Sequence, residues 1–205
     1  MQTTPQVTLL KTRSRHQRWF GLAALLAYAL STPVLPHDSV AARLLAVAGY
    51  LLVLAGAGIR VYAALFIGGW KNARLASGGP YSVVRNPLYV GSLIAAAGVG
   101  LLTGTATLAL GMPVVLAYYY DRTVRREEAW LEREFGEPYR EYLRSVPRWI
   151  PDLSRWSLPE QVNARPRYVW KGLRDVLPIL LVWPAVECVR LAHAGGLLPA
   201  LYRMF

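Results

Sequence analysis

The chain has 205 residues, 54% of them hydrophobic, and a formal net charge of +11. The length suits one domain with its own core, and the apolar residues come in long blocks, which indicates a helical membrane protein rather than a soluble domain. Basic residues flank these blocks as the positive-inside rule requires, so the charge indicates a membrane surface and argues against a nucleic-acid partner. The single cysteine excludes an intrachain disulfide, and three scattered histidines lack metal-ligand spacing, so we assign no metal.

The first part of the chain, residues 1–67, predicts two transmembrane helices. Residues 19–36 are apolar behind a basic start, a pattern that a secretory signal peptide shares. We expect this segment to stay as a helix, with the N-terminus cytoplasmic. Residues 40–67 form the second predicted span, and Ser39 or Asp38 is suited to cap its first turn.

Four residues inside the second span carry specific expectations. Gly49, Gly56 and Gly58 permit close packing against a neighbouring helix. Arg60 lies about two turns before the end of the span. It is suited either to reach the cytoplasmic interface as an anchor or to point into a polar cavity.

A loop rich in Gly, Pro and Tyr follows at residues 78–91. Residues 68–87 carry bases and no acids, which places this loop on the cytoplasmic side. Pro80 and Pro87 each disfavour helical geometry in the residue before them, and Asn86-Pro87 is suited to open a helix. We therefore expect a structured loop that leads directly into the next apolar segment.

The next segment, residues 86–120, contains no charged side chain. One straight helix over this stretch would be about 52 Å long, against a hydrocarbon core of roughly 30 Å. The chain must therefore turn back, and Thr103-Gly104-Thr105 is the natural break. This predicts a helical hairpin with arms near 88–102 and 106–122, closed by an interfacial cluster of tyrosines at 118–120.

Charged residues return at 121–150, with apolar residues at helical spacing among them. This predicts an amphipathic helix that continues from the hairpin, breaks at Gly136 and is followed by a short helix that stops before Pro147. Residues 152–174 are expected to lie at the interface, and 175–193 form a weaker transmembrane candidate. The fold class is an all-α integral membrane protein with about five transmembrane helices. We divide it into 1–67, a core at 68–151 and a C-terminal part at 152–205.

The hairpin returns the chain to the side that it left. Arg85 and Asn86 should therefore lie near Arg122, Arg126 and Glu127. The resulting pocket would have a charged roof and an apolar floor open to lipid. Such a pocket suits a polar cofactor above and a lipophilic substrate below, although charged clusters at a membrane interface are also common as simple ion pairs.

A family resemblance rests on several motifs that occur in order over residues 70–151. They are Gly79-Pro80-Tyr81, Arg85-Asn86-Pro87-Leu88-Tyr89-Val90-Gly91, Glu127-Glu128, Phe135-Gly136-Glu137-Pro138-Tyr139 with Tyr142, Val146-Pro147 and Ile150-Pro151. In this region the chain resembles the isoprenylcysteine carboxyl methyltransferases and the wider group of membrane phospholipid methyltransferases.

The resemblance implies a membrane methyltransferase that binds S-adenosylmethionine on the cytosolic side and admits its substrate from the bilayer. The residues it assigns to the cofactor are Leu75, Ala76, Tyr81, Arg85, Asn86, Pro87, Leu88, Tyr89 and Glu127. Glu127 would hold the cationic methionine end of the cofactor, since a carboxylate is a favourable partner for an ammonium or sulfonium in a low-dielectric pocket.

Two positions depart from the family pattern. Asn86 stands where the family has a histidine, so a proton relay through that side chain is lost. The family's substrate-binding arginine falls near Thr123, so Arg122 or Arg126 would have to replace it. We therefore take Arg122, Arg126 and Glu127 as the candidate catalytic residues.

The expected reaction is direct in-line methyl transfer to a lipid-like carboxylate, thiol or amine. The sulfonium is already activated, so positioning supplies most of the catalysis. An anionic acceptor needs no base, whereas an amine would need one, from Glu127, Glu128 or less readily Tyr89. The alternatives are an NADPH-dependent membrane reductase related to sterol reductases and a non-catalytic membrane scaffold. The expected location is a prokaryotic inner membrane.

Overall fold

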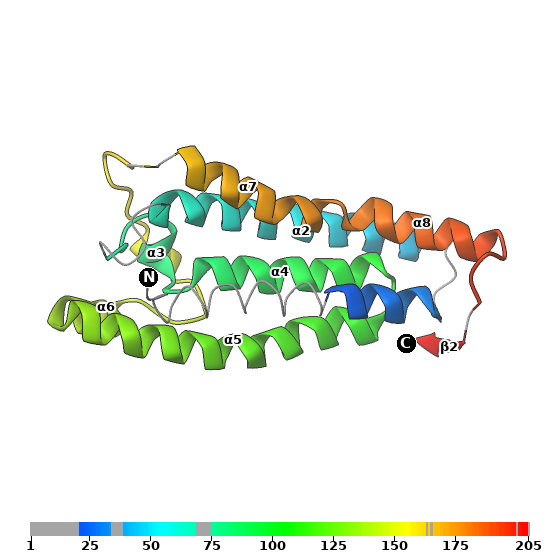
Figure 1. Cartoon of the computed structure of the whole chain (residues 1–205), viewed down its shortest axis with the longest axis horizontal. Coiled ribbons are helices and arrows are strands. Elements are labelled where there is room, and N and C mark those ends of the chain that lie inside the picture. The colour runs from blue at the N-terminus through cyan, green and yellow to red at the C-terminus, as the bar shows by residue number, and fades with distance from the viewer. Residues whose placement is uncertain are drawn as a thin grey trace, which may run out of the picture.

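A computed structural model describes residues 21–33, 39–68, 75–162, 164, 166–199 and 201–204. Long helices run side by side, and α4 lies between α2 and α5, while α7 packs on α2 and α8 contacts α4 (Figure 1). The long helices are α2 (Val40–Ile67), α4 (Pro87–Leu102), α5 (Ala106–Phe135), α7 (Pro166–Leu180) and α8 (Val182–Ala194).

The shorter elements lie at the two ends of this bundle. Residues 21–29 are also helical and lead into strand β1 (Ser31–Pro33), which pairs in parallel with β2 (Tyr202–Met204). The opposite end carries α3 (Pro80–Val83), α6 (Glu137–Ser145) and the 3-10 helix η1 (Leu153–Arg155). The described part of the chain is thus helical apart from one pair of three-residue strands and its loops, as the sequence predicts.

Helices α2 and α4 touch through two pairs of glycines. A Cβ on Gly49 would lie 2.7 Å from the carbonyl oxygen of Gly98, and a Cβ on Gly56 would lie 2.4 Å from that of Gly91. Close backbone contact is the usual role of such residues in membrane helices. The prediction for Gly49 and Gly56 is confirmed. That for Gly58 is wrong, because no described residue lies within 4 Å of a Cβ there.

The predicted hairpin is confirmed. Helix α4 starts with Pro87 at its first position and ends at Leu102, and α5 starts at Ala106. Gly104 adopts a φ of +69° in the turn, a conformation that glycine reaches without a Cβ clash. Thr103 Oγ1 donates to the Gly100 carbonyl at 2.6 Å, which satisfies a carbonyl at the end of α4.

Helix α5 continues without interruption from the apolar hairpin arm into the charged region. It ends at Phe135, and Gly136 takes a φ of +62° before α6 begins at Glu137. Tyr120 is not interfacial as expected but nearly fully buried, with its ring centroid 4.7 Å from that of Tyr89 on α4. Burial of Tyr120, Val124 and Glu128, four residues apart, defines the face of α5 that meets the rest of the protein.

The C-terminal helical region begins earlier than predicted, at Pro166 instead of 175. The stretch 169–194 and helix α2 are long and apolar enough to cross a membrane, and they are the two such helices among the described residues. Helix α4 is also apolar, but it is shorter than these two stretches. The count of about five spans stays a prediction, as does the division into three parts, and the first predicted span at 19–36 lies partly outside the described residues.

Candidate active site

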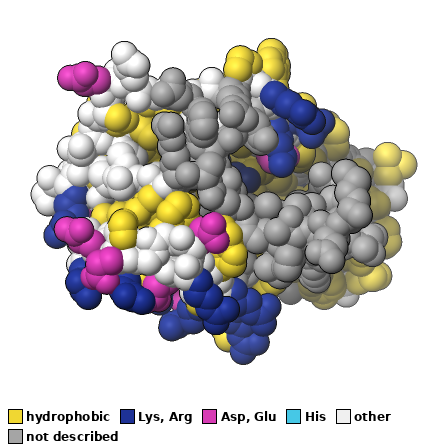
Figure 2. All heavy atoms as spheres, turned by 60° about the vertical axis from the view of Figure 1, so that its left-hand side comes forward, with side chains coloured by type: hydrophobic (Ala, Val, Ile, Leu, Met, Phe, Trp, Pro, Cys, Tyr) yellow, Lys and Arg dark blue, Asp and Glu magenta, His cyan; other side chains and the backbone are white. Residues whose placement is uncertain are grey.

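A cavity of about 110 Å³ lies at the bundle end where α2, α3, α4, α5 and α6 meet. Its walls come from five separate stretches of sequence. The lining residues are Ile67, Leu75, Ala76, Tyr81, Arg85, Asn86, Pro87, Leu88, Tyr89, Glu127, Glu128, Leu131, Tyr139 and Tyr142. At this end of the molecule, basic and acidic side chains gather side by side (Figure 2).

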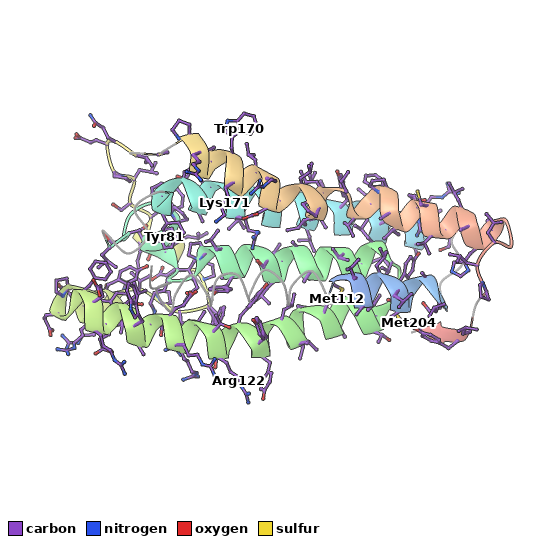
Figure 3. All side chains as sticks on the ribbon, viewed as in Figure 1. Tyr81, Met112, Arg122, Trp170, Lys171 and Met204 are labelled. Carbon is purple, nitrogen blue, oxygen red and sulfur yellow. The ribbon has the colours of Figure 1, made fainter. Side chains whose placement is uncertain are left out.

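All nine residues that the sequence assigns to the cofactor line this cavity. Arg122 and Arg126, two of the three candidate catalytic residues, do not: both are exposed. The Arg122 guanidinium lies 4.5 Å from the centre of the Tyr118 ring and donates to its hydroxyl, and Figure 3 shows the side chain directed away from the bundle. Glu127 is therefore the candidate catalytic residue that the fold brings to the cavity.

The loop before α4 is held in place by the segment after α6. The backbone N–H of Arg85 donates to the Pro147 carbonyl at 2.9 Å, and that of Asp152 donates to the Val83 carbonyl at 2.9 Å. The Asn86 side chain donates from Nδ2 to the Arg148 carbonyl at 3.3 Å. The Asn86 amide, which stands where the family has a histidine, therefore holds the first turn of α4 against the segment after α6.

Sequence reasoning missed the buried ion-pair cluster beside Glu127. The Glu128 side chain is only 9% exposed and pairs with Arg85 at 3.1 Å and with Arg148 at 2.6 Å. A buried carboxylate needs such partners, because an unpaired charge in a low-dielectric interior is strongly unfavourable. Arg148 lies 20 residues along the chain from Glu128, so no local spacing could have identified this partner.

Aromatic rings close the cavity on the side of α6. The Tyr142 hydroxyl donates to the Tyr81 carbonyl at 2.8 Å, which ties α6 to α3. Figure 3 shows Tyr81 at this end of the bundle, where it is part of α3. Burial raises the pKa of Tyr139, and the charge of Glu128 adds to the rise. Burial also raises the pKa of Tyr142, so both phenols stay neutral at physiological pH.

Arg60 lies next to the cavity, on the inner side of α2. It donates from Nη1 to the Leu88 carbonyl at 3.3 Å and also to the Ser92 hydroxyl. Of the two expectations for this residue, the structure favours an inward orientation over an anchor at the lipid surface. Its contacts support the same first turns of α4 from which Leu88 and Tyr89 line the cavity.

The chemistry of the cavity wall suits a ligand of mixed charge. Two carboxylates, one arginine and four tyrosine rings surround a floor of aliphatic side chains. Within the part of the chain that the structure describes, no three His, Cys, Asp or Glu side chains gather as a potential metal site.

Comparison with known proteins places these features in a family context. The sequence pattern of the family described as phospholipid methyltransferase matches residues 38–138. The chain is 31% identical to a nickel-cobalt-cadmium resistance protein, NccN, of Alcaligenes xylosoxydans xylosoxydans over 190 residues, which cover 92% of this chain and 88% of the relative. It is also 31% identical to a cobalt-zinc-cadmium resistance protein, CzcN, of Cupriavidus metallidurans over 141 residues, covering 69% of this chain and 65% of the relative.

A third similarity is to an enzyme of known class. Over 81 residues the chain is 37% identical to the protein-S-isoprenylcysteine O-methyltransferase of Schizosaccharomyces pombe. This alignment covers 40% of the chain and 34% of the yeast enzyme. No solved structure matches the chain.

Proposed function

We propose that this chain transfers a methyl group from S-adenosylmethionine to a lipophilic acceptor. The chain belongs to the phospholipid methyltransferase family, and this membership confirms the resemblance seen in its motifs. The chain is a methyltransferase, and its two apolar helices fit a membrane protein. The cofactor, the acceptor class and the roles of individual residues are our proposal. We also propose that the cavity faces the cytoplasm, because charged residues gather at its end of the bundle, and that the N-terminus does so too, because basic residues precede the first predicted span.

One observation carries the proposal. The residues that the motifs assign to the cofactor come from positions as far apart as Leu75 and Glu127, and they line one cavity. The lining also fits the chemical groups of S-adenosylmethionine. Glu127 suits the cationic ammonium and sulfonium, Arg85 suits the carboxylate, and the apolar Leu75, Ala76 and Leu131 suit the adenine ring.

The cavity is smaller than a complete cofactor pocket. About 110 Å³ is less than the roughly 300 Å³ at which small-molecule pockets begin. We therefore propose that side chains at the rim move apart when the cofactor binds. Leu75 and Leu131 pack against the aromatic cluster of α6, and such partly buried side chains repack more readily than the ion-paired Glu128.

The protein's own groups would supply positioning more than acid–base chemistry. Bound S-adenosylmethionine supplies the activated methyl group, so alignment of the acceptor supplies most of the remaining rate. Glu127 lines the cavity, and we propose it as the carboxylate that accepts a proton from an amine acceptor. An acceptor that is already a carboxylate or thiolate needs no such base. Arg85 is the arginine that lines the cavity, and we assign it the anion-binding role first expected of Arg122 or Arg126.

Calorimetric titration of the detergent-purified full chain with S-adenosylmethionine tests the proposal. We expect saturable binding that weakens about tenfold to a hundredfold in Glu127→Ala, the change expected for loss of a charge-assisted contact. Tyr89→Ala should weaken binding as well. Glu134→Ala removes an exposed carboxylate from the same helix and should bind like the wild type.

Each arm of this titration has a defined reading. Absence of S-adenosylmethionine binding by folded wild-type protein, with binding of NADPH instead, would refute the proposal in favour of a reductase. Equal binding by wild type and Glu127→Ala would show that Glu127 does not hold the cofactor.

A further inference from the structure

A second concave surface lies beside the cavity and is separate from it. This basic groove measures about 590 Å³ and is lined by residues 143–147 and 150–152 together with Arg85 and Arg155. Its charged side chains are Arg85, Arg144, Arg155 and Asp152, so positive charge predominates. Arg85 also lines the cofactor cavity, so this one side chain borders both.

The groove has cationic groups that the rest of the protein only partly neutralises. Arg144 reaches Glu137 at a long 3.4 Å and stays 73% exposed. Arg155 pairs with Asp152 at 2.9 Å and stays about half exposed. The Nε of Arg85 is buried, and it has no hydrogen-bond partner in the described structure. An anion in the groove would therefore find donors at hand and a favourable potential.

The position of the groove indicates a membrane surface. Trp156, one residue after Arg155, stacks on Tyr62 near the C-terminal end of the membrane-length helix α2, with ring centroids 6.1 Å apart and planes at 14°. Aromatic residues at this level are typical of the boundary between lipid and water. The segment that carries the groove therefore lies where α2 leaves the apolar layer.

The same segment exposes large apolar side chains next to its arginines. Ile150 is 81% exposed and Leu153 is 73% exposed, and Trp156 and Leu158 are exposed as well. Exposed apolar residues in one short segment indicate a binding surface, and apolar side chains beside arginines are typical of segments that lie in a lipid headgroup layer. The apolar side chains would enter the acyl boundary while the arginines stay among the phosphates.

We propose that the basic groove binds the phosphate headgroup of an anionic membrane phospholipid. The proposal does not depend on methyl transfer, because the groove and its arginines are distinct from the residues assigned to the cofactor, apart from Arg85. Arg85 lines both the groove and the cofactor cavity, so a headgroup bound in the groove would lie next to that cavity.

The test uses full-length protein in a non-ionic detergent, titrated with a short-chain phosphatidylglycerol and followed by calorimetry. Separate titrations use short-chain phosphatidylcholine and inorganic phosphate. The test variant is Arg144→Gln/Arg155→Gln. The matched control is Arg125→Gln/Arg133→Gln, which removes one ion-paired and one exposed arginine from α5.

We expect wild type and control to bind phosphatidylglycerol more tightly than phosphatidylcholine. The groove variant should lose about thirtyfold in affinity, as expected for two arginines at a charged lipid surface. Equal binding by the groove variant and the control would overturn the proposal and point to another partner, such as an acidic protein. Inorganic phosphate binding as tightly as the lipid would also overturn it, because the groove would then be a site for the free anion.

Discussion

The glycine contact between α2 and α4 gives the sharpest quantitative prediction. In Gly56→Ala the new Cβ would lie 2.4 Å from the Gly91 carbonyl oxygen and 2.7 Å from the Ala95 backbone nitrogen. Both neighbours are backbone atoms of one helix, so no side-chain rotation relieves the clash. Helix α4 would have to move outward, and with it the first turn that carries Leu88 and Tyr89.

The expected magnitude combines two opposing effects. Overpacking of a tight contact destabilises by about 1–3 kcal/mol, and here the rigid backbone places the effect near the upper end. Replacing glycine by alanine inside a helix stabilises by roughly 0.5–1 kcal/mol. The net destabilisation is therefore about 2 kcal/mol, which corresponds to a fall of roughly 4–8 °C in the unfolding midpoint for a domain of this size.

The matched control lies on the same helix. Gly58→Ala adds the same methyl group where none of the described atoms lies within 4 Å, so only the favourable helix effect remains and the midpoint should rise. Thermal unfolding of both variants in one detergent, followed by circular dichroism, makes the comparison. If Gly56→Ala were as stable as Gly58→Ala, the close approach of α2 and α4 would be refuted.

Two further predictions concern the cavity wall. Glu128→Gln should destabilise the protein by about 3 kcal/mol, because it leaves the partly buried Arg85 and Arg148 without their anion. Glu134→Gln, which changes an exposed carboxylate on the same helix, should affect stability much less. Thermal unfolding of the two variants checks this, and equal losses would contradict it. The raised pKa values of Tyr139 and Tyr142 mean that the folded state holds these protons more tightly than the unfolded chain, so stability should fall as pH rises above about 10. Tyr142→Phe should show a shallower alkaline loss in a pH series of unfolding midpoints, and an unchanged slope would count against the assignment.

The sequence alone predicted the helical hairpin and nine of the residues that line the cavity. An uncharged stretch too long for one crossing, with Thr103-Gly104-Thr105 at its middle, leaves little choice but to turn back, and the structure turns there. Backbone chemistry also determined where α4 starts, because Pro87 suits the first helical position. The motifs identified nine residues that line the cavity, although they lie in separate segments.

Only the tertiary structure decided which charged residues face the cavity. Arg122, Arg126, Glu127 and Glu128 are close in sequence, and successive helical residues point about 100° apart. The rotation of α5 about its axis decides among them, and it is set by packing of Tyr120 and Val124 against α4 and the segment after α6. That rotation turns Glu128 toward Arg148 and leaves Arg122 and Arg126 exposed. Long-range packing of this kind has no local sequence signal, which is why the ion pair of Glu128 with Arg148 emerged from the fold alone.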